Sequence, residues 1–199
     1  MSDPKTLMQM AGADPRPFKL SESALVVIDA QRDYLDGHLP LTGVEAALKQ
    51  IATLLVAARE HGRPVIHVQH RGKPGGLFDP ETDNFAICAE ATPEAGEGVI
   101  EKGLPNAFAG TGLDEALKTA GAKQLVVCGF MTHMCVSSTV RAALDLGYGS
   151  TVVASACATR DLPAASGGVV PAAVLHEAEL AALSDRFAMI AREASEVIA

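Results

Sequence analysis

Residues 24–31 read Ala-Leu-Val-Val-Ile-Asp-Ala-Gln, a short apolar run that ends in an acid. The run is rich in β-branched residues and apolar at successive positions, which is typical of a strand covered on both faces of a parallel sheet. Asp29 follows it directly, and open parallel sheets place functional groups at the carboxyl ends of their strands. This stretch therefore predicts a buried strand with a candidate functional carboxylate at its end.

The same pattern recurs along the chain and alternates with segments of helix length. Further strands are predicted at residues 64–68, 99–100, 125–128, 151–154 and 187–190, and helices at 44–61, 111–120, 132–146 and 172–183. Gly62 and Gly147 mark the ends of two of these helices. Strands that alternate with helices indicate right-handed βαβ units around a parallel sheet, so the predicted fold class is α/β.

The composition suits one such domain. The chain has 199 residues, 48% hydrophobic and 20% charged, which is enough to bury roughly 70% of the unfolded surface. Its net charge of −8, without a basic block, disfavours nucleic acid or an anionic membrane as the partner. The apolar runs are far shorter than the roughly 20 residues that span a bilayer. We expect a polar arm at 1–23, which lacks the apolar region of a signal peptide, and a single domain at 24–199.

Four cysteines bear on the cellular compartment. No two form a CxxC pair, which excludes that redox motif and a zinc ribbon. Their spread through a long apolar chain favours free thiols over a disulfide scaffold, so we expect a cytoplasmic protein. Cys128 and Cys157 are expected to be buried and inert, and Cys88 is a candidate for exposure because it lies in a long loop.

That loop runs from Gly72 to Gly98 and contains three Pro-linked turns. Loops of this length in compact domains are often lids or binding loops. Its aromatic residues, Phe78 and Phe85, are candidates for covering a pocket. An equally good interpretation is that they only anchor the loop to the core.

Three side chains stand out at predicted strand ends. Asp29 ends the first strand, Lys102 ends the third, and Cys135 follows the fourth in the segment Gly-Phe-Met-Thr-His-Met-Cys at 129–135. If Thr132 caps the next helix, Cys135 lies in its first turn, where unpaired N–H groups and the helix dipole lower a thiol pKa. Each residue alone is more often structural. Together they predict a nucleophilic site, because a thiol nucleophile needs a base and a stabilising charge.

These segments resemble the isochorismatase-like cysteine hydrolase superfamily, which includes nicotinamidase, N-carbamoylsarcosine amidohydrolase and isochorismatase. The resemblance is carried by residues 25–31, by Lys102 with 107–113, and by 129–136, which is similar to the family's G-x-x-T-x-x-C-V signature. It extends over about residues 24–192. It implies a three-layer α/β/α sandwich around a mostly parallel six-stranded sheet, and a homo-oligomer, dimer or tetramer, since the family commonly assembles.

The resemblance also implies roles for individual residues. Asp29, Lys102 and Cys135 would form the catalytic triad, in which Asp29 takes the thiol proton and later activates water. Lys102 would stay cationic and keep Asp29 ionised. A cis peptide bond before Met131 would aim the backbone N–H groups of Met131 and Cys135 at one point, as an oxyanion hole.

The pocket is expected near these strand ends. Its walls are assigned to Gln31, Tyr34, Leu35, Phe78, Phe85, Phe130 and Met134. Because these walls are largely apolar, we expect a small, largely neutral or aromatic amide as substrate.

His133 is expected at the pocket rim, since residues two apart on a helix face different sides. Arg160 follows the fifth strand and is expected to shape the pocket or a subunit contact, and the contributions of His38, His67 and His70 are left open.

No metal and no cofactor are predicted. Nicotinamidases carry an Asp-x-His pair and a further His that bind a metal, with a later Asp-x-His-Pro. In this chain the corresponding segment, residues 67–72, reads His-Val-Gln-His-Arg-Gly. We therefore expect no catalytic metal, and nicotinamide becomes a less favoured substrate.

Cys135 separates the possible reactions. Isochorismatases proper lack this nucleophile because vinyl-ether hydrolysis does not pass through an acyl-enzyme. The sequence therefore favours hydrolysis of a carbon–nitrogen bond through a thioester. The alternatives are a vinyl-ether hydrolase in which Cys135 is dispensable, a catalytically silent binding protein on the same fold, and a peroxide-sensing thiol protein with Cys128 as resolving cysteine.

Overall fold

A computed structural model describes residues 3–198, and its centre is a six-stranded sheet. The strand order is β3–β2–β1–β4–β5–β8, and every neighbouring pair is parallel. The strands are β1 Ala24–Ile28, β2 Val65–His70, β3 Gly98–Lys102, β4 Gln124–Phe130, β5 Gly149–Ala158 and β8 Met189–Ala191. The predicted α/β class and six-stranded sheet are confirmed.

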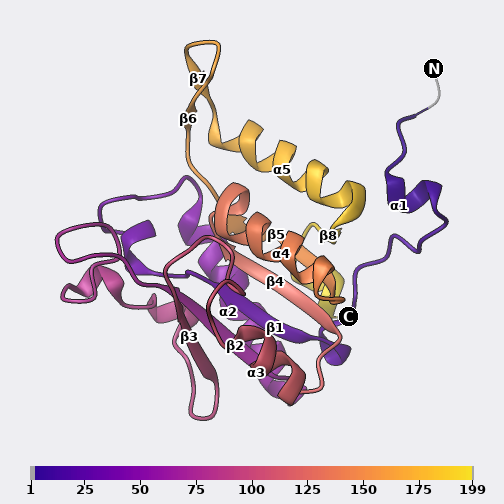
Figure 1. The fold of residues 1–199 in the computed structure, drawn as a ribbon, viewed down its shortest axis with the longest axis horizontal. Coiled ribbons are helices and arrows are strands. Elements are labelled where there is room, and N and C mark those ends of the chain that lie inside the picture. The colour runs from indigo at the N-terminus through magenta and orange to yellow at the C-terminus, as the bar shows by residue number, and fades with distance from the viewer. Residues whose placement is uncertain (1–2, 199) are drawn as a thin grey trace.

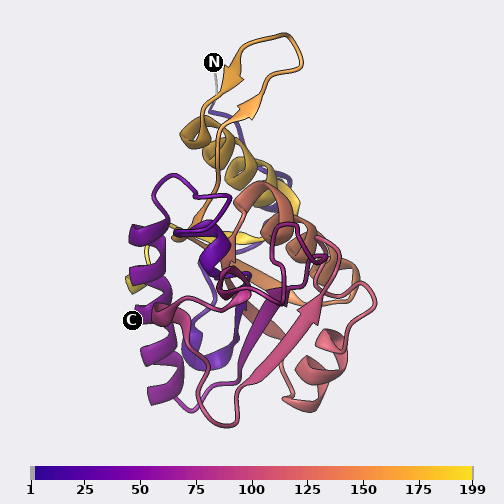
Figure 2. The same cartoon turned by 90° about the vertical axis from the view of Figure 1, so that its left-hand side faces the viewer.

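Helices cover both faces of the sheet and complete three layers (Figures 1 and 2). One face carries α2 Val44–Glu60 and the short α6 Ser195–Ile198, and the other carries α3 Leu113–Thr119, α4 Ser137–Asp145 and α5 Ala172–Arg186. All five side chains of β1 are buried, and they alternate between two hydrophobic clusters, one on each face. This double burial explains the unbroken apolar run at residues 24–28.

Several boundaries differ from the sequence-based prediction. β2 runs to His70 and β5 runs to Ala158, because backbone pairing with a neighbouring strand continues past the apolar run. The helix predicted at 132–146 is divided into a π-helical turn, Thr132–Val136, and α4. Additional short elements are α1 Leu7–Met10 and a hairpin of β6 Leu162–Pro163 with β7 Val169–Val170, which projects from the body in Figure 2.

The predicted N-terminal arm lies on the domain over its described part. The backbone N–H of Leu7 donates to Asp185 Oδ1 on α5 at 2.7 Å, and that of Phe18 donates to Thr151 Oγ1 on β5 at 2.9 Å. Leu20 has no exposed surface and belongs to the core. The end of the arm is therefore part of the hydrophobic core.

The winding of the sheet reverses between β1 and β4, which are neighbours although two strands lie between them in sequence. Gly129, near the end of β4, has a φ of +116°, and a Cβ there would lie 1.9 Å from the carbonyl oxygen of Ile28. Only glycine permits this close approach. In doubly wound sheets such a reversal opens a crevice at the carboxyl ends of the strands, where ligands bind.

The long loop between β2 and β3 folds onto the body with two short 3₁₀ turns, Asp83–Phe85 and Ala89–Ala91. Phe78, Cys88 and Ala91 are buried in the hydrophobic cluster on the α2 face. Cys88 therefore differs from the expectation of an exposed thiol, because apolar loop residues cover it.

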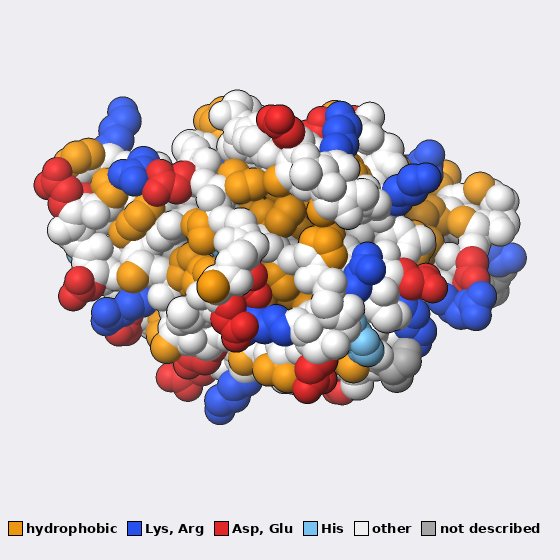
Figure 3. Space-filling model, turned by 90° about the horizontal axis from the view of Figure 1, so that it is seen from below, with side chains coloured by type: hydrophobic (Ala, Val, Ile, Leu, Met, Phe, Trp, Pro, Cys, Tyr) orange, Lys and Arg blue, Asp and Glu red, His pale blue; other side chains and the backbone are white. Residues whose placement is uncertain are grey.

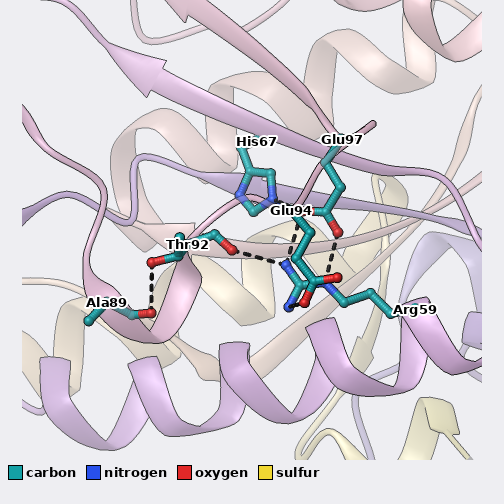
Figure 4. A network of polar contacts seen from close by, with 6 residues as sticks. All are labelled: Arg59, His67, Ala89, Thr92, Glu94 and Glu97. Atoms are coloured by element: carbon teal, nitrogen blue, oxygen red, sulfur yellow. Dashed lines mark hydrogen bonds and ion pairs between the residues drawn. The ribbon is translucent and has the colours of Figure 1, made fainter.

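A polar network fixes the end of this loop to α2 (Figure 4). Arg59 Nε donates to Glu97 Oε1 at 2.8 Å, and His67 Nε2 lies 2.8 Å from Glu97 Oε2. Burial lowers the pKa of His67, so its neutral ring donates to the carboxylate. Burial alone would raise the pKa of Glu97, but the hydrogen bonds from Arg59, the backbone of Glu94 and His67 outweigh it and lower the pKa to about 2.

Among residues 3–198, no helix combines the length and the apolar character needed to cross a bilayer. On the face seen in Figure 3, acidic and basic side chains are interspersed around an apolar middle, without a continuous basic patch.

Replacing Glu97 with Gln is expected to lower the free energy of unfolding by about 2 kcal/mol at neutral pH, since hydrogen bonds to charged groups contribute about 1.5–3 kcal/mol. The folded-state pKa of about 2 lies below the ordinary 4.5, so this stabilisation is complete above pH 4.5 and disappears as the pH falls toward 2. Urea denaturation at several pH values measures both effects.

Glu101→Gln is the matched control, because Glu101 pairs with Arg71 where both side chains are more than 40% exposed. Screening by water makes such a pair weak. Equal destabilisation by the two substitutions would contradict the role assigned to the Glu97 network.

Candidate active site

Four neighbouring strands end at one edge of the sheet, and each contributes one polar side chain. Lys102 is the last residue of β3, His70 is the last of β2, Asp29 follows β1, and Cys135 lies in the π-helical turn after β4. The register pairs His70 directly with Lys102. The three predicted residues are thus brought together at the reversal of the sheet, and His70 joins them.

The ammonium group of Lys102 is the centre of this cluster. Its Nζ lies 2.7 Å from Asp29 Oδ2, 2.9 Å from His70 Nδ1 and 3.3 Å from Cys135 Sγ. The side chains of Lys102 and Asp29 have no exposed surface. A buried ammonium must have acceptors for its three protons, and these three atoms supply them.

Asp29 is held in an unusual backbone conformation and in an apolar environment. Its φ is +49°, in the left-handed region that Asp tolerates better than most residues. The carboxylate forms an ion pair with Lys102 and a hydrogen bond with the thiol of Cys135. Burial raises the pKa of Asp29, and the nearby Lys102 charge opposes that rise. The carboxylate is therefore a stronger base than an exposed one.

The environment of Cys135 differs from the one expected from sequence. Thr132 does not cap a helix, because its hydroxyl donates to the carbonyl oxygen of Ala158 at 3.1 Å. Burial and the charge of Asp29 raise the pKa of Cys135, Lys102 opposes this rise, and the resulting pKa is about 12. The resting side chain is a thiol rather than a thiolate. A nucleophilic Cys135 would need a base within reach, and Asp29 is the available one.

The backbone beside Cys135 has the cis peptide bond that the family resemblance implies, between Phe130 and Met131. Met131 is buried in the cluster that also contains Tyr34 and Phe130. The assignment of the Met131 and Cys135 N–H groups to an oxyanion hole stays a prediction.

The aromatic residues assigned to the pocket lie together. The Tyr34 ring contacts the rings of Phe78, with centroids 4.9 Å apart, and Phe130, at 5.9 Å. Phe130 has no exposed surface, so it contacts Tyr34 from within the hydrophobic core. The Tyr34 hydroxyl has no hydrogen-bond partner among residues 3–198. Burial raises the pKa of Tyr34, as do the charges of Asp29 and Cys135.

The remaining pocket candidates are placed less directly. Leu35, Phe85 and Met134 are partly buried and pack against the core around the aromatic group. Gln31 differs from the expectation, because its amide is fully used by backbone groups. Gln31 Nε2 donates to the carbonyl oxygens of His70 and Phe85, and Oε1 accepts from the N–H of His70. Gln31 therefore connects the end of β2 to the loop and does not offer its amide to a substrate.

The cysteines and histidines outside the cluster are also placed. Cys128 and Cys157 are buried, as predicted, and all four cysteines are free, so no disulfide links Cys128 to Cys135. His133 Nδ1 lies 2.5 Å from Thr159 Oγ1, and its Nε2 is buried without a partner. His38 contacts Asp33 Oδ1, whereas His67 belongs to the Glu97 network on the α2 face.

Two further groups complete the polar side of the site. The sequence did not decide whether His70 contributes to the pocket. Its position at the end of a strand is nevertheless the same signal that singled out Asp29 and Lys102. Arg160 follows β5 and has no ion pair or hydrogen bond among residues 3–198, and its Nε is buried. Its charge lowers the pKa of His133 and opposes the rise in that of Tyr34.

The cluster does not suit a metal ion. The potential ligand atoms of Asp29, His70 and Cys135 lie within 4.8 Å of one another. However, the ammonium of Lys102 contacts all three residues and already supplies the positive charge there. A metal ion would have to displace a buried lysine, so no step is assigned to a metal.

Comparison with known proteins identifies relatives over nearly the whole chain. The family model described as "Isochorismatase domain" matches residues 23–195. An isochorismatase family protein of Bacillus subtilis, YddQ, is 43% identical over 171 residues, which cover 84% of this chain and 94% of that protein. A streptothricin hydrolase of Streptomyces noursei is 36% identical over 174 residues, 86% of this chain and 63% of that protein.

Solved structures share the fold. The crystal structure of an isochorismatase from Pseudomonas putida superposes with a TM-score of 0.94 at 47% identity, and covers 98% of this chain and 100% of that one. An N-carbamoylsarcosine amidase from Thermoplasma acidophilum superposes with a TM-score of 0.73 at 25% identity, over 86% of this chain and 96% of that one.

The cluster predicts opposite effects of two substitutions on thiol reactivity. Asp29→Asn removes the charge that raises the pKa of Cys135, so alkylation of Cys135 by iodoacetamide is expected to become faster, by about tenfold per unit of pKa. Lys102→Met removes the charge that lowers this pKa, so alkylation is expected to become slower. Peptide mass spectrometry during a time course measures both rates.

Cys88, Cys128 and Cys157 are internal references, because their labelling is expected to be slow and the same in all variants. If Asp29→Asn slowed the labelling of Cys135, the assigned electrostatic coupling would be wrong.

Proposed function

The chain belongs to the isochorismatase family of hydrolases, and from this premise we propose that it cleaves a carbon–nitrogen bond of a small amide through a thioester on Cys135. The observation that carries the proposal is the contact of the Lys102 ammonium with both Asp29 Oδ2 and Cys135 Sγ, in a cluster where the side chains of Lys102 and Asp29 have no exposed surface. This arrangement supplies a nucleophile, a base and a fixed positive charge within one cluster.

The proposed reaction begins with proton transfer from the Cys135 thiol to the Asp29 carboxylate. The sulfur attacks the amide carbon, and the carbonyl oxygen becomes an oxyanion that the N–H groups of Met131 and Cys135 would stabilise. The carbon–nitrogen bond then breaks, and Asp29 returns the proton to the leaving nitrogen. The products of this half-reaction are an amine or ammonia and a thioester.

Water completes the cycle. Asp29, again ionised, takes a proton from water, which attacks the thioester carbon and releases the carboxylic acid. The sulfur regains its proton from Asp29. Lys102 remains cationic throughout, and its charge keeps Asp29 ionised between turnovers. A high thiol pKa in the resting site limits side reactions of Cys135, because little thiolate is present before the substrate binds.

The unpaired guanidinium of Arg160 supports a substrate that carries an acidic group. A half-buried cation without a partner is costly unless a ligand supplies the counter-charge. The apolar residues alone suggested a neutral amide, and the buried Nε of Arg160 without a partner adds a candidate contact for a carboxylate. We therefore propose ureido acids and acidic amides as the substrate class.

Some expectations stay predictions. A homo-oligomer is supported only by apolar residues that are exposed on the hairpin and α5, such as Val169 and Val174. The absence of a cofactor and the cytoplasmic location also stay predictions.

Cys135→Ala is expected to reduce amide hydrolysis at least about a thousandfold, because loss of a covalent nucleophile removes the thioester path. Turnover of primary amides, ureido acids and lactams can be followed by ammonia or amine release. Cys128→Ala, seven residues earlier and outside the cluster, is the matched control and should retain turnover. Retained activity in Cys135→Ala would instead favour a vinyl-ether hydrolase in which the thiol is dispensable.

Arg160→Leu is expected to raise KM at least about tenfold for an acidic substrate and to change KM little for its neutral analogue, since the lost charged contact is specific to the acid. Arg186→Leu, at the exposed end of α5, is the matched control. Equal changes in KM for acidic and neutral substrates would contradict the assignment of Arg160.

A further inference from the structure

The Lys102 ammonium carries three protons, and the proposed reaction uses only two of its three contacts. Asp29 Oδ2 at 2.7 Å and Cys135 Sγ at 3.3 Å belong to the proposed triad, and His70 Nδ1 at 2.9 Å is the third acceptor. The inference rests on the proposed function, because it concerns how the same three side chains are held in place.

The His70 ring is fixed from several directions. His70 ends β2 and is paired in register with Lys102 on β3. Its backbone N–H donates to Gln31 Oε1 at 2.8 Å, and its carbonyl oxygen accepts from Gln31 Nε2 at 3.0 Å. The ring also lies against that of Phe78, with centroids 5.2 Å apart. These contacts hold Nδ1 toward the ammonium.

The protonation state of His70 suits this contact. Burial and the charge of Lys102 together lower the pKa of His70 to about 4, so the ring is neutral near pH 7. Because Nδ1 of the neutral ring accepts a hydrogen bond from the Lys102 ammonium, the ring hydrogen is on Nε2. A neutral acceptor satisfies the third ammonium proton without cancelling the positive charge, whereas a carboxylate there would compete with Asp29.

We propose that His70 is a positioning residue of the site, whose Nδ1 holds the Lys102 ammonium between Asp29 and Cys135. The lysine ammonium is carried by a flexible chain of four methylene groups. Of its three contacts in the cluster, the one to Cys135 Sγ is the longest. Without the third acceptor, a buried N–H is left unpaired and the ammonium turns away from the sulfur to find another partner. His70 thus acts on the thiol through Lys102.

The test uses the alkylation of Cys135 by iodoacetamide, which requires no knowledge of the substrate. His70→Leu removes the acceptor at similar volume and is expected to slow alkylation about tenfold. His70→Asn places Oδ1 where Nδ1 lies in the native ring and should keep the rate within about threefold of native. His61→Leu, on the exposed end of α2, is the matched control and should leave the rate unchanged.

A double-mutant cycle with Lys102→Met identifies the path of the effect. If His70 acts through Lys102, His70→Leu slows alkylation by less than about twofold when Lys102 is already replaced. If His70→Leu instead slowed the alkylation of Cys135 by the same factor with native Lys102 and with Lys102→Met, the effect would not pass through Lys102, and the proposal would be overturned. A rate in His70→Asn as low as that in His70→Leu would also overturn it. Circular dichroism and thermal melting confirm that each variant is folded.

The outcome is separable from that of the proposed function. If Cys135→Ala kept full turnover, the thioester mechanism would be wrong, and the labelling cycle would still decide whether His70 holds Lys102. Conversely, an additive cycle would remove the role of His70 and leave the roles proposed for Asp29, Lys102 and Cys135 intact.

Discussion

The buried ion pair between Lys102 and Asp29 is the constraint on which the site depends. Removing two charges from water costs several kcal/mol per ion, and good geometry with further hydrogen bonds is needed to offset that cost. Here the two side chains have no exposed surface and lie 2.7 Å apart. The ends of β1 and β3 must therefore stay in register across β2, which the parallel pairing of all three strands ensures.

The surrounding structure follows from this pair. His70 ends β2, the strand that lies between those of Asp29 and Lys102. The amide of Gln31 connects the backbone of His70 to that of Phe85 in the loop between β2 and β3. Gly129 allows β4 to approach β1 closely enough to present the following turn, with Cys135, to the same ammonium. The site is thus a property of four adjacent strand ends and not of any single segment.

Electrostatics in this site differ from those of an exposed helix terminus. The sequence predicts that the dipole of a helix lowers the pKa of the Cys135 thiol. In the folded protein burial is the largest effect and raises the pKa of both Asp29 and Cys135. In the proposed reaction, the thiolate is therefore reached by proton transfer between two buried groups, and the charge of Lys102 stabilises an anion on either of them.

Much of the fold could be predicted because its signals are local. The strand at 24–28 was predicted to the residue, since burial on both faces requires an unbroken apolar run. The end of β5, the division of the helix at 132–146 and the hairpin at 162–170 were not, because backbone pairing and packing with distant residues decide them. The burial of Cys88 under the long loop and the His67–Glu97–Arg59 network also depend on contacts between segments about thirty residues or more apart.

The sequence by itself determined the parallel α/β architecture, the family and the positions of Asp29, Lys102 and Cys135 at strand ends. Hydrophobic periodicity and the order of the motifs carry that information, and both can be recognised within short segments of the sequence. Only the tertiary structure decided that His70 is the third partner of the Lys102 ammonium and that the amide of Gln31 forms hydrogen bonds with backbone groups. It also decided that the pKa of the Cys135 thiol rises. Each of these depends on which groups exclude water and donate hydrogen bonds at distances of about 3 Å, and only the folded chain brings those groups together.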